Sequence, residues 1–340
     1  MILGISPVRI SFAGGGTDMP EYYEEFGGRV ITTAINHFTY VIYNSRDDNL
    51  TQIFSSDFSA HNAPSTFEKL ESQEGTEIPT SIMKYLDFRS GGNLMISSDV
   101  PPRSGLGSSS ALAVNLVNVL TKVSNNKRTK HEIADITHKI ERDLLKWPNG
   151  KQDEYISVFG GFNMIKFEKK GIELEKIPIS SGAYTELQQN LLLYFVGGRT
   201  SSTILPNQLN SIKNKEPQVL ESLHNVRELA ITMYDHLKNS DITGFGEMLH
   251  KGWMAKKRFA KGVSNEKIDS IYENVIKKGV VGGKLTGAGG GGHLLLYCEK
   301  NKHASIDEYM KNQGLKRIKF SFHKEGARIL NLYDYAKKQG

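Results

Sequence analysis

The stretch PPRSGLGSSSA, residues 101–111, runs directly into an apolar segment with helical spacing, residues 111–123. Glycines and serines at the start of a helix leave backbone N–H groups unpaired, and the helix dipole adds partial positive charge there. Together these two effects make a binding site for phosphate. The stretch therefore predicts a nucleotide-binding loop that opens a helix. The alternative is a plain helix N-cap, in which Ser108 or Ser109 bonds its own backbone.

The spacing within this stretch differs from the two common phosphate-binding motifs. A Walker A loop requires a lysine after its second glycine, whereas Gly107 is followed by serine. A dinucleotide-binding fingerprint requires a third glycine at the position of Ser110. The sequence therefore argues against both a P-loop NTPase and a Rossmann dehydrogenase.

Length and composition predict an ordinary globular protein with two domains. The 340 residues exceed what one hydrophobic core usually fills, and 38% of them are hydrophobic and 24% charged. The chain lacks a run of roughly 18 apolar residues and a basic region before its apolar start. Its single cysteine, Cys298, cannot form an internal disulfide. We therefore expect a cytoplasmic protein that does not bind a membrane.

The net charge of +6 admits an anionic partner. Lysines and arginines are spread along the chain in pairs, without a long basic block or an array interleaved with aromatic residues. This distribution favours small anionic substrates over nucleic acid, which remains an outside alternative.

Apolar periodicity predicts a mixed order of strands and helices. Strands are expected at residues 30–43, 93–97, 162–167, 191–196, 293–298 and 317–322. Helices are expected at residues 111–123, after the capping-box pair Thr129 and Glu132, and at residues 219–237 and 268–278. A domain boundary is expected near residues 180–182, which divides the chain into residues 1–182 and 183–340.

Two further glycine clusters flank the first one at a distance. KLTGAGGGGH, residues 284–293, contains four consecutive glycines, which a fold tolerates where the backbone needs positive φ or close approach. SPVRISFAGGGTD, residues 6–18, carries Arg9 inside an apolar strand, and a buried arginine needs a carboxylate or phosphate partner. Asp18 after the glycines fits hydrogen bonding to the hydroxyls of a polyol, or else a turn or a helix N-cap. A tight turn without a ligand is the alternative for residues 284–293.

The three clusters, in this order, resemble the three motifs of the GHMP kinase superfamily, and they reach across nearly the whole chain. The resemblance implies an α+β fold with an N-terminal ribosomal-protein-S5-like domain and a C-terminal ferredoxin-like domain. ATP and substrate would meet in the cleft between the two domains.

The resemblance also assigns roles to residues of this chain. The residues that would contact ATP are Pro102, Gly105, Leu106, Gly107, Ser108, Ser109 and Ser110. Ser109 and Glu141 would hold Mg²⁺, an ion that needs few protein oxygens. Asp153 would accept the proton of the attacking hydroxyl, and Arg9 would pair with it. The residues that would contact the substrate are Gly15, Gly16, Thr17, Asp18, Arg199, Thr200, Gly287, Ala288 and Gly289.

Within the superfamily, the form GGGTD, with GKQDEY at 150–155 and GGRTSS at 197–202, is similar to the D-glycero-D-manno-heptose 7-phosphate kinase branch. This implies an ATP-dependent kinase that phosphorylates the anomeric hydroxyl to give the 1,7-bisphosphate. Arg199 would hold the 7-phosphate, with the basic run at 256–258 as a second candidate or a solvated helix face. The alternatives are another sugar-1-kinase, of the fucokinase, galactokinase or hexosamine kinase type, and a non-catalytic sensor of sugar and ATP.

Overall fold

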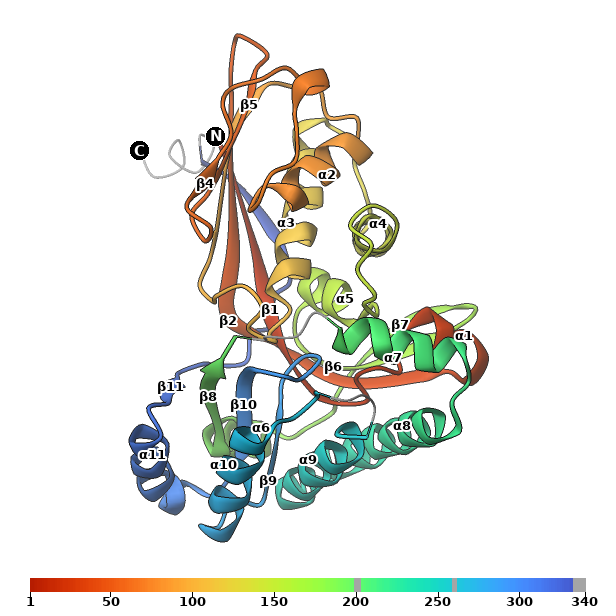
Figure 1. Cartoon of the computed structure of the whole chain (residues 1–340), viewed down its shortest axis with the longest axis vertical. Coiled ribbons are helices and arrows are strands. Elements are labelled where there is room, and N and C mark those ends of the chain that lie inside the picture. Colours follow the sequence, from red (N-terminus) through yellow and green to blue (C-terminus); the bar gives the residue numbers. More distant parts are fainter. Residues whose placement is uncertain (199–202, 259–261, 333–340) are drawn as a thin grey trace.

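The computed structural model of the chain describes residues 1–198, 203–258 and 262–332. Within these ranges the strands form a sheet of eight and a sheet of four. Figure 1 shows the larger sheet in the upper part of the molecule and the smaller sheet below it, with helices packed against both. None of the described helices is long and apolar enough to cross a membrane.

The larger sheet is organised around one long strand, β2. The strands of this sheet are β1 (Ile2–Ala13), β2 (Gly28–Ser45), β3 (Thr51–Ser55), β4 (Ala60–His61), β5 (Gly92–Ser98), β6 (Phe162–Glu168), β7 (Gly171–Lys176) and β12 (Arg328–Asn331). β2 pairs with β1 along most of its length, while its first part also pairs with β6 and its last part with β5. The β-branched and aromatic residues of β2 suit such a buried pleated surface.

Helices cover one face of this sheet. Residues 101–107, called the phosphate loop below, lead directly into one of them, α3 (Ser108–Val123). The helices of the amino-terminal half are α1 (Pro20–Phe26), α2 (Glu77–Tyr85), α3 (Ser108–Val123), α4 (Lys130–Asp143) and α5 (Gln152–Phe159), with a short 3-10 turn, Phe67–Lys69. α3 is apolar on nearly all sides because it packs against the sheet and also against α2, α4 and α5. The predicted capping box of α4 is confirmed, with both Thr129–Glu132 bonds formed.

The smaller sheet has the strand order β11-β8-β10-β9. Its strands are β8 (Leu191–Gly197), β9 (Gly282–Leu285), β10 (Gly292–Tyr297) and β11 (Lys316–Ile318). The helices of this half are α6 (Ser181–Asn190), α7 (Ile204–Lys213), α8 (Pro217–Lys238), α9 (Ile242–Lys256), α10 (Glu266–Lys277) and α11 (His303–Asn312), with a second 3-10 turn, Lys300–Lys302. β8 and β10 are nearly continuous apolar runs because both faces of this sheet are buried.

A single apolar cluster joins the two sheets. It contains Phe12 of β1, Ile31 of β2, Leu193 of β8 and Leu295 of β10, together with residues of α8 and α9. Phe12 makes edge-to-face ring contacts with Phe162, Phe245 and Phe322 inside this cluster. The end of β1 is therefore held rigidly between the two halves, directly beside the cavity described below.

One expectation about the carboxyl-terminal half differs from the structure. The strand expected at residues 317–322 ends at Ile318, and Phe322 makes only an isolated bridge to Ile35, because the chain leaves the smaller sheet there. The last strand, β12, then pairs with β1, so residues 328–331 belong to the larger sheet. A boundary at residue 182 stays a prediction, although Ser180 is the N-cap of α6 and not part of a loose linker.

Candidate active site

Arg9 enters the site because of the alternation of β1. Val8, Ile10 and Phe12 point into the apolar core, so Arg9 and Ser11 point the opposite way, into a cavity. Arg9 is 4% exposed, and its backbone N–H donates to the Leu106 carbonyl at 2.9 Å. The strand therefore fixes both the position of the guanidinium and the phosphate loop beside it.

The phosphate loop ends in a left-handed glycine at the start of α3. Gly107 is the N-cap of the helix with φ of 73°, and the cap carries no side-chain hydrogen bond. The alternative of a serine N-cap is therefore wrong. Ser108, Ser109 and Ser110 line the cavity within the first helical turn. This geometry leaves the first N–H groups of α3 for an anion, as the sequence predicts.

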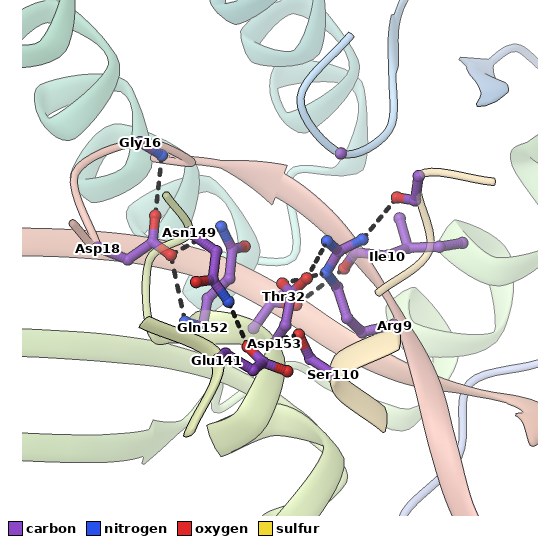
Figure 2. Close-up of polar contacts among 12 residues, drawn as sticks. Arg9, Ile10, Gly16, Asp18, Thr32, Ser110, Glu141, Asn149, Gln152 and Asp153 are labelled. Atoms are coloured by element: carbon purple, nitrogen blue, oxygen red, sulfur yellow. Dashed lines mark hydrogen bonds and ion pairs between the residues drawn. The ribbon is translucent and has the colours of Figure 1, made fainter. Parts of the chain in front are cut away.

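Asp153 and Arg9 form a bidentate, or two-pronged, salt bridge. Nε of Arg9 donates to Oδ1 of Asp153 and Nη2 to Oδ2, each at 2.7 Å, while Nη1 donates to the Gly105 carbonyl at 2.6 Å. Asp153 lies in the first turn of α5, where the helix dipole favours a negative charge, and its side chain is 20% exposed. The predicted pairing is confirmed, and Figure 2 shows the pair between Asp18 and the phosphate loop.

Asp18 lines the cavity on the side opposite the phosphate loop (Figure 2). Its carboxylate accepts hydrogen bonds from the Gly16 N–H at 2.9 Å and from Nε2 of Gln152 at 3.1 Å (Figure 2). Asp18 is not the N-cap of α1, since Met19 occupies that position. Burial raises the pKa of the Asp18 carboxyl, and the nearby charge of Asp153 raises it further. Asp18 is thus a fixed polar group suited to a hydroxyl ligand.

The third glycine cluster closes the cavity from the other half of the chain. Gly287 has φ of 66°, and a Cβ there would lie 2.7 Å from the Cα of Gly105. A Cβ on Gly105, in turn, would lie 2.7 Å from the carbonyl oxygen of Thr286. His293 of β10 contacts the Ser104 carbonyl at 2.8 Å. The two loops therefore interlock backbone to backbone, around a cavity of about 550 Å³.

Glu141 of α4 lies behind the cavity wall. Its Oε2 accepts hydrogen bonds from the Ser110 hydroxyl at 3.1 Å and from the amide of Asn149. Burial, first, and the neighbouring Glu154 raise the pKa of the Glu141 carboxyl well above its usual value. Ser109 and Glu141 as holders of Mg²⁺ stay a prediction: Glu141 contacts Ser110, and both Ser109 and Ser110 line the cavity, whereas Glu141 does not.

A buried Glu–His pair supports the helix that carries Asp153. Nδ1 of His138 lies 2.7 Å from Oε1 of Glu154, and both side chains are almost fully buried. Burial lowers the pKa of His138 to about 4 and raises that of Glu154, which lies next to Asp153 in sequence. Sequence reasoning missed this pair. No local pattern joins the two residues, because His138 lies on α4 and Glu154 on α5.

Most of the predicted site residues lie at the cavity, but not all. Those that line it are Arg9, Gly15, Gly16, Asp18, Gly105, Gly107, Ser108, Ser109, Ser110, Asp153, Gly287, Ala288 and Gly289. Leu106 packs into the core instead, and Thr17 is buried with its hydroxyl donating to the Gly14 carbonyl. Pro102 does not line the cavity either. Arg199 and Thr200 lie outside the described residues.

Several cavity residues were not singled out from the sequence. Gln152, the first residue of α5, contacts Asp18, and Asn149, in the connection from α4 to α5, contacts Glu141. Gln208 of α7 also lines the cavity. Amide side chains of this kind carry no charge pattern, so only their place in the fold identifies them.

Comparison with known proteins identifies the family of the chain. The GHMP kinases N-terminal domain matches residues 77–161, and the GHMP kinases C-terminal domain matches residues 233–314. D-glycero-alpha-D-manno-heptose 7-phosphate kinase of Campylobacter jejuni is 30% identical over 330 residues, which cover 95% of this chain and 97% of that protein. The chain belongs to the GHMP kinase family. It is therefore an ATP-dependent phosphotransferase that acts on a sugar hydroxyl.

Solved structures of GHMP kinases share the fold. A D-glycero-D-manno-heptose 1-phosphate kinase of Bacteroides thetaiotaomicron superposes with a TM-score of 0.81 at 22% identity, covering 97% of this chain and 99% of the other. Lactococcus lactis galactokinase, solved with galactose, gives 0.76 at 18% identity, covering 96% and 95%. The expected two-domain GHMP kinase fold of mixed helices and strands is confirmed.

Proposed function

We propose that this GHMP kinase transfers the γ-phosphoryl group of ATP to the anomeric hydroxyl of D-glycero-D-manno-heptose 7-phosphate, giving the 1,7-bisphosphate. The main support is one arrangement: the Arg9–Asp153 pair stands between the amino end of α3 and Asp18 in a shared cavity. The heptose 7-phosphate kinase relative, similar along almost the whole chain, supports the choice of sugar.

In this reaction Asp153 accepts the proton of the sugar hydroxyl as its oxygen forms a bond to the γ-phosphorus. The bond from that phosphorus to the bridging oxygen of ADP breaks, and ADP leaves. The two-pronged contact with Arg9 uses one lone pair on each carboxylate oxygen, so each oxygen keeps another lone pair for the proton. Arg9 also holds the Asp153 carboxylate in place and offsets the charge of the transferred group.

The residues around Glu141 fit a magnesium ion. Within the described part of the chain, Oε1 of Glu141 is buried without a hydrogen-bond partner, which is costly for a carboxylate that lacks a cation. We propose that Glu141, with the hydroxyl of Ser109 or Ser110, holds Mg²⁺ at the phosphates. The ion would neutralise charge on the phosphate oxygens of ATP.

A Glu141→Gln variant tests this magnesium site. Glutamine matches the shape of the neutral carboxyl that burial favours, so the variant should fold, but it cannot supply a charged ligand. We expect the Mg²⁺ concentration for half-maximal rate to rise roughly 10- to 100-fold. Asp143→Asn, which changes an exposed carboxylate at the end of the same helix, should leave the Mg²⁺ titration unchanged. An unchanged titration for Glu141→Gln would remove Glu141 from the metal site.

A panel of acceptors tests the proposed substrate. We expect ADP release, measured in a coupled assay, to be fastest with the heptose 7-phosphate and much slower with the free heptose, fucose, galactose or a hexosamine. An ionic hydrogen bond to the 7-phosphate is worth about 1.5 to 3 kcal/mol, which corresponds to a roughly 10- to 150-fold higher kcat/KM for the phosphorylated heptose. Faster turnover of a free sugar would contradict the proposed substrate but not the kinase chemistry. Absence of ADP release with every sugar would favour a sensor.

A further inference from the structure

Lys256, the last residue of α9, reaches the cavity from the carboxyl-terminal half of the chain. The residue is 9% exposed, and its Nζ donates a hydrogen bond to the Gly287 carbonyl oxygen. The neighbouring Lys257 instead pairs with Asp269 of α10 at 3.2 Å, and it does not line the cavity. Of the three basic residues 256–258, Lys256 thus lines the cavity, whereas Lys257 and Arg258 do not.

The surroundings of Lys256 place it on the acceptor side of the cavity. Ala255, one residue earlier, packs against an apolar cluster that contains Met19, and Leu205 packs against the same cluster. Met19 and Leu205 line the cavity together with Asp18, which we assign to the sugar. The ATP phosphates, in contrast, are assigned to the amino end of α3. Lys256 therefore stands where the acceptor wall meets the glycine loop at 287–291.

Positive charge gathers at this corner. Lys284 of β9 is buried, and its Nζ donates to the Phe12 carbonyl at 3.0 Å. Burial lowers the pKa of Lys284 well below its usual value, and the charges of Lys256 and Arg9 lower it further. Asp153 already compensates Arg9 through its two-pronged contact. A phosphate group bound at this corner would be attracted by the positive charges of Lys256 and Arg9.

We infer that Lys256 is a phosphate-binding group of the acceptor subsite, where its Nζ contacts an oxygen of the phosphate ester carried by the sugar. This inference rests on the proposed function, because it requires an acceptor that is itself phosphorylated. A lysine ammonium binds phosphate as a compact point charge with several donors, so it can keep the Gly287 contact and bind the ester as well.

The decisive variant is Lys256→Gln, with Lys257→Gln as its matched control. Glutamine keeps an N–H donor on a side chain one atom shorter and removes the charge, and the midpoint of thermal unfolding checks that the variant folds. We expect KM for the heptose 7-phosphate to rise roughly 10- to 100-fold, as for the loss of one ionic hydrogen bond. KM for ATP and kcat/KM for the unphosphorylated heptose should stay unchanged. Lys257→Gln should behave as the wild type with all three substrates.

The outcomes separate this inference from the proposed function. If the wild type prefers the phosphorylated acceptor and Lys256→Gln leaves KM unchanged, the inference is wrong and the proposed function stands. A rise in KM for ATP alone would assign Lys256 to the nucleotide phosphates and overturn the inference. Equal losses with both sugars would show a general role in the fold or in catalysis, and overturn it too. A wild type that prefers the free sugar would contradict both proposals.

Discussion

An Asp153→Asn variant should lose turnover while ATP still binds. Asparagine preserves the shape of the side chain, but it cannot take the proton of the sugar hydroxyl, and its amide cannot match the charge of Arg9. General-base help is worth roughly 10²- to 10⁴-fold in rate, so kcat should fall by that range. The measurement is a coupled assay of ADP release, combined with calorimetric titration of ATP into the variant.

Two results would decide the role of Asp153. A variant that turns over at the wild-type rate would remove Asp153 from the mechanism, and a variant that no longer binds ATP would point to a collapsed site. Arg9→Lys is the informative companion, because lysine keeps the charge but cannot make the two-pronged contact seen with Asp153. We expect Arg9→Lys to retain a part of the activity that Asp153→Asn loses.

A Gly105→Ala variant should lose activity almost as severely, for a steric reason. Gly105 has φ of 79°, and the added Cβ would lie 2.7 Å from the Thr286 carbonyl oxygen. The backbone cannot yield there without separating the phosphate loop from the glycine loop of the other half. Displacing catalytic groups by about 1 Å costs roughly 10²-fold, and we expect kcat/KM for ATP to fall by that much.

Gly314→Ala is the matched control for this substitution. Gly314 also has a positive φ, 73°, but a Cβ there would meet no atom within 4 Å. It should therefore show only the backbone strain of about 1 kcal/mol, seen as a lower free energy of unfolding, with kcat/KM unchanged. If Gly105→Ala loses no more activity than Gly314→Ala, the interlocked loops are not needed for catalysis.

The sequence allowed us to predict that the three glycine clusters meet at one site. It did not allow us to predict which of two adjacent residues lines the cavity. Glycine runs mark places where a backbone must approach closely, and the structure brings all three to one cavity. Lys256 and Lys257 look alike in sequence, yet successive residues of a helix point about 100° apart, so only the packing of α9 selects Lys256. Leu106 and Thr17 fall within the motifs but face inward.

Helix α9 shows why some helices cannot be predicted from local sequence. Its sequence, ITGFGEMLHKGWMAK, contains three glycines, which predict a loop more than a helix. Gly246 is needed because a Cβ would lie 2.3 Å from the ring of Tyr297, so the helix can pack closely on β10. Tertiary packing outweighs local propensity here, and such a contact between residues far apart in sequence leaves no local pattern to detect.

The apolar cluster shared by the two sheets has a consequence for how the enzyme opens. Phe12, Leu193 and Leu295 are buried in one cluster between the two sheets. Separating the sheets would therefore expose a large apolar surface to water. Rigid-body swinging of one half against the other is therefore expensive, and we expect reactants to enter and products to escape through small local excursions of the segments that rim the cavity.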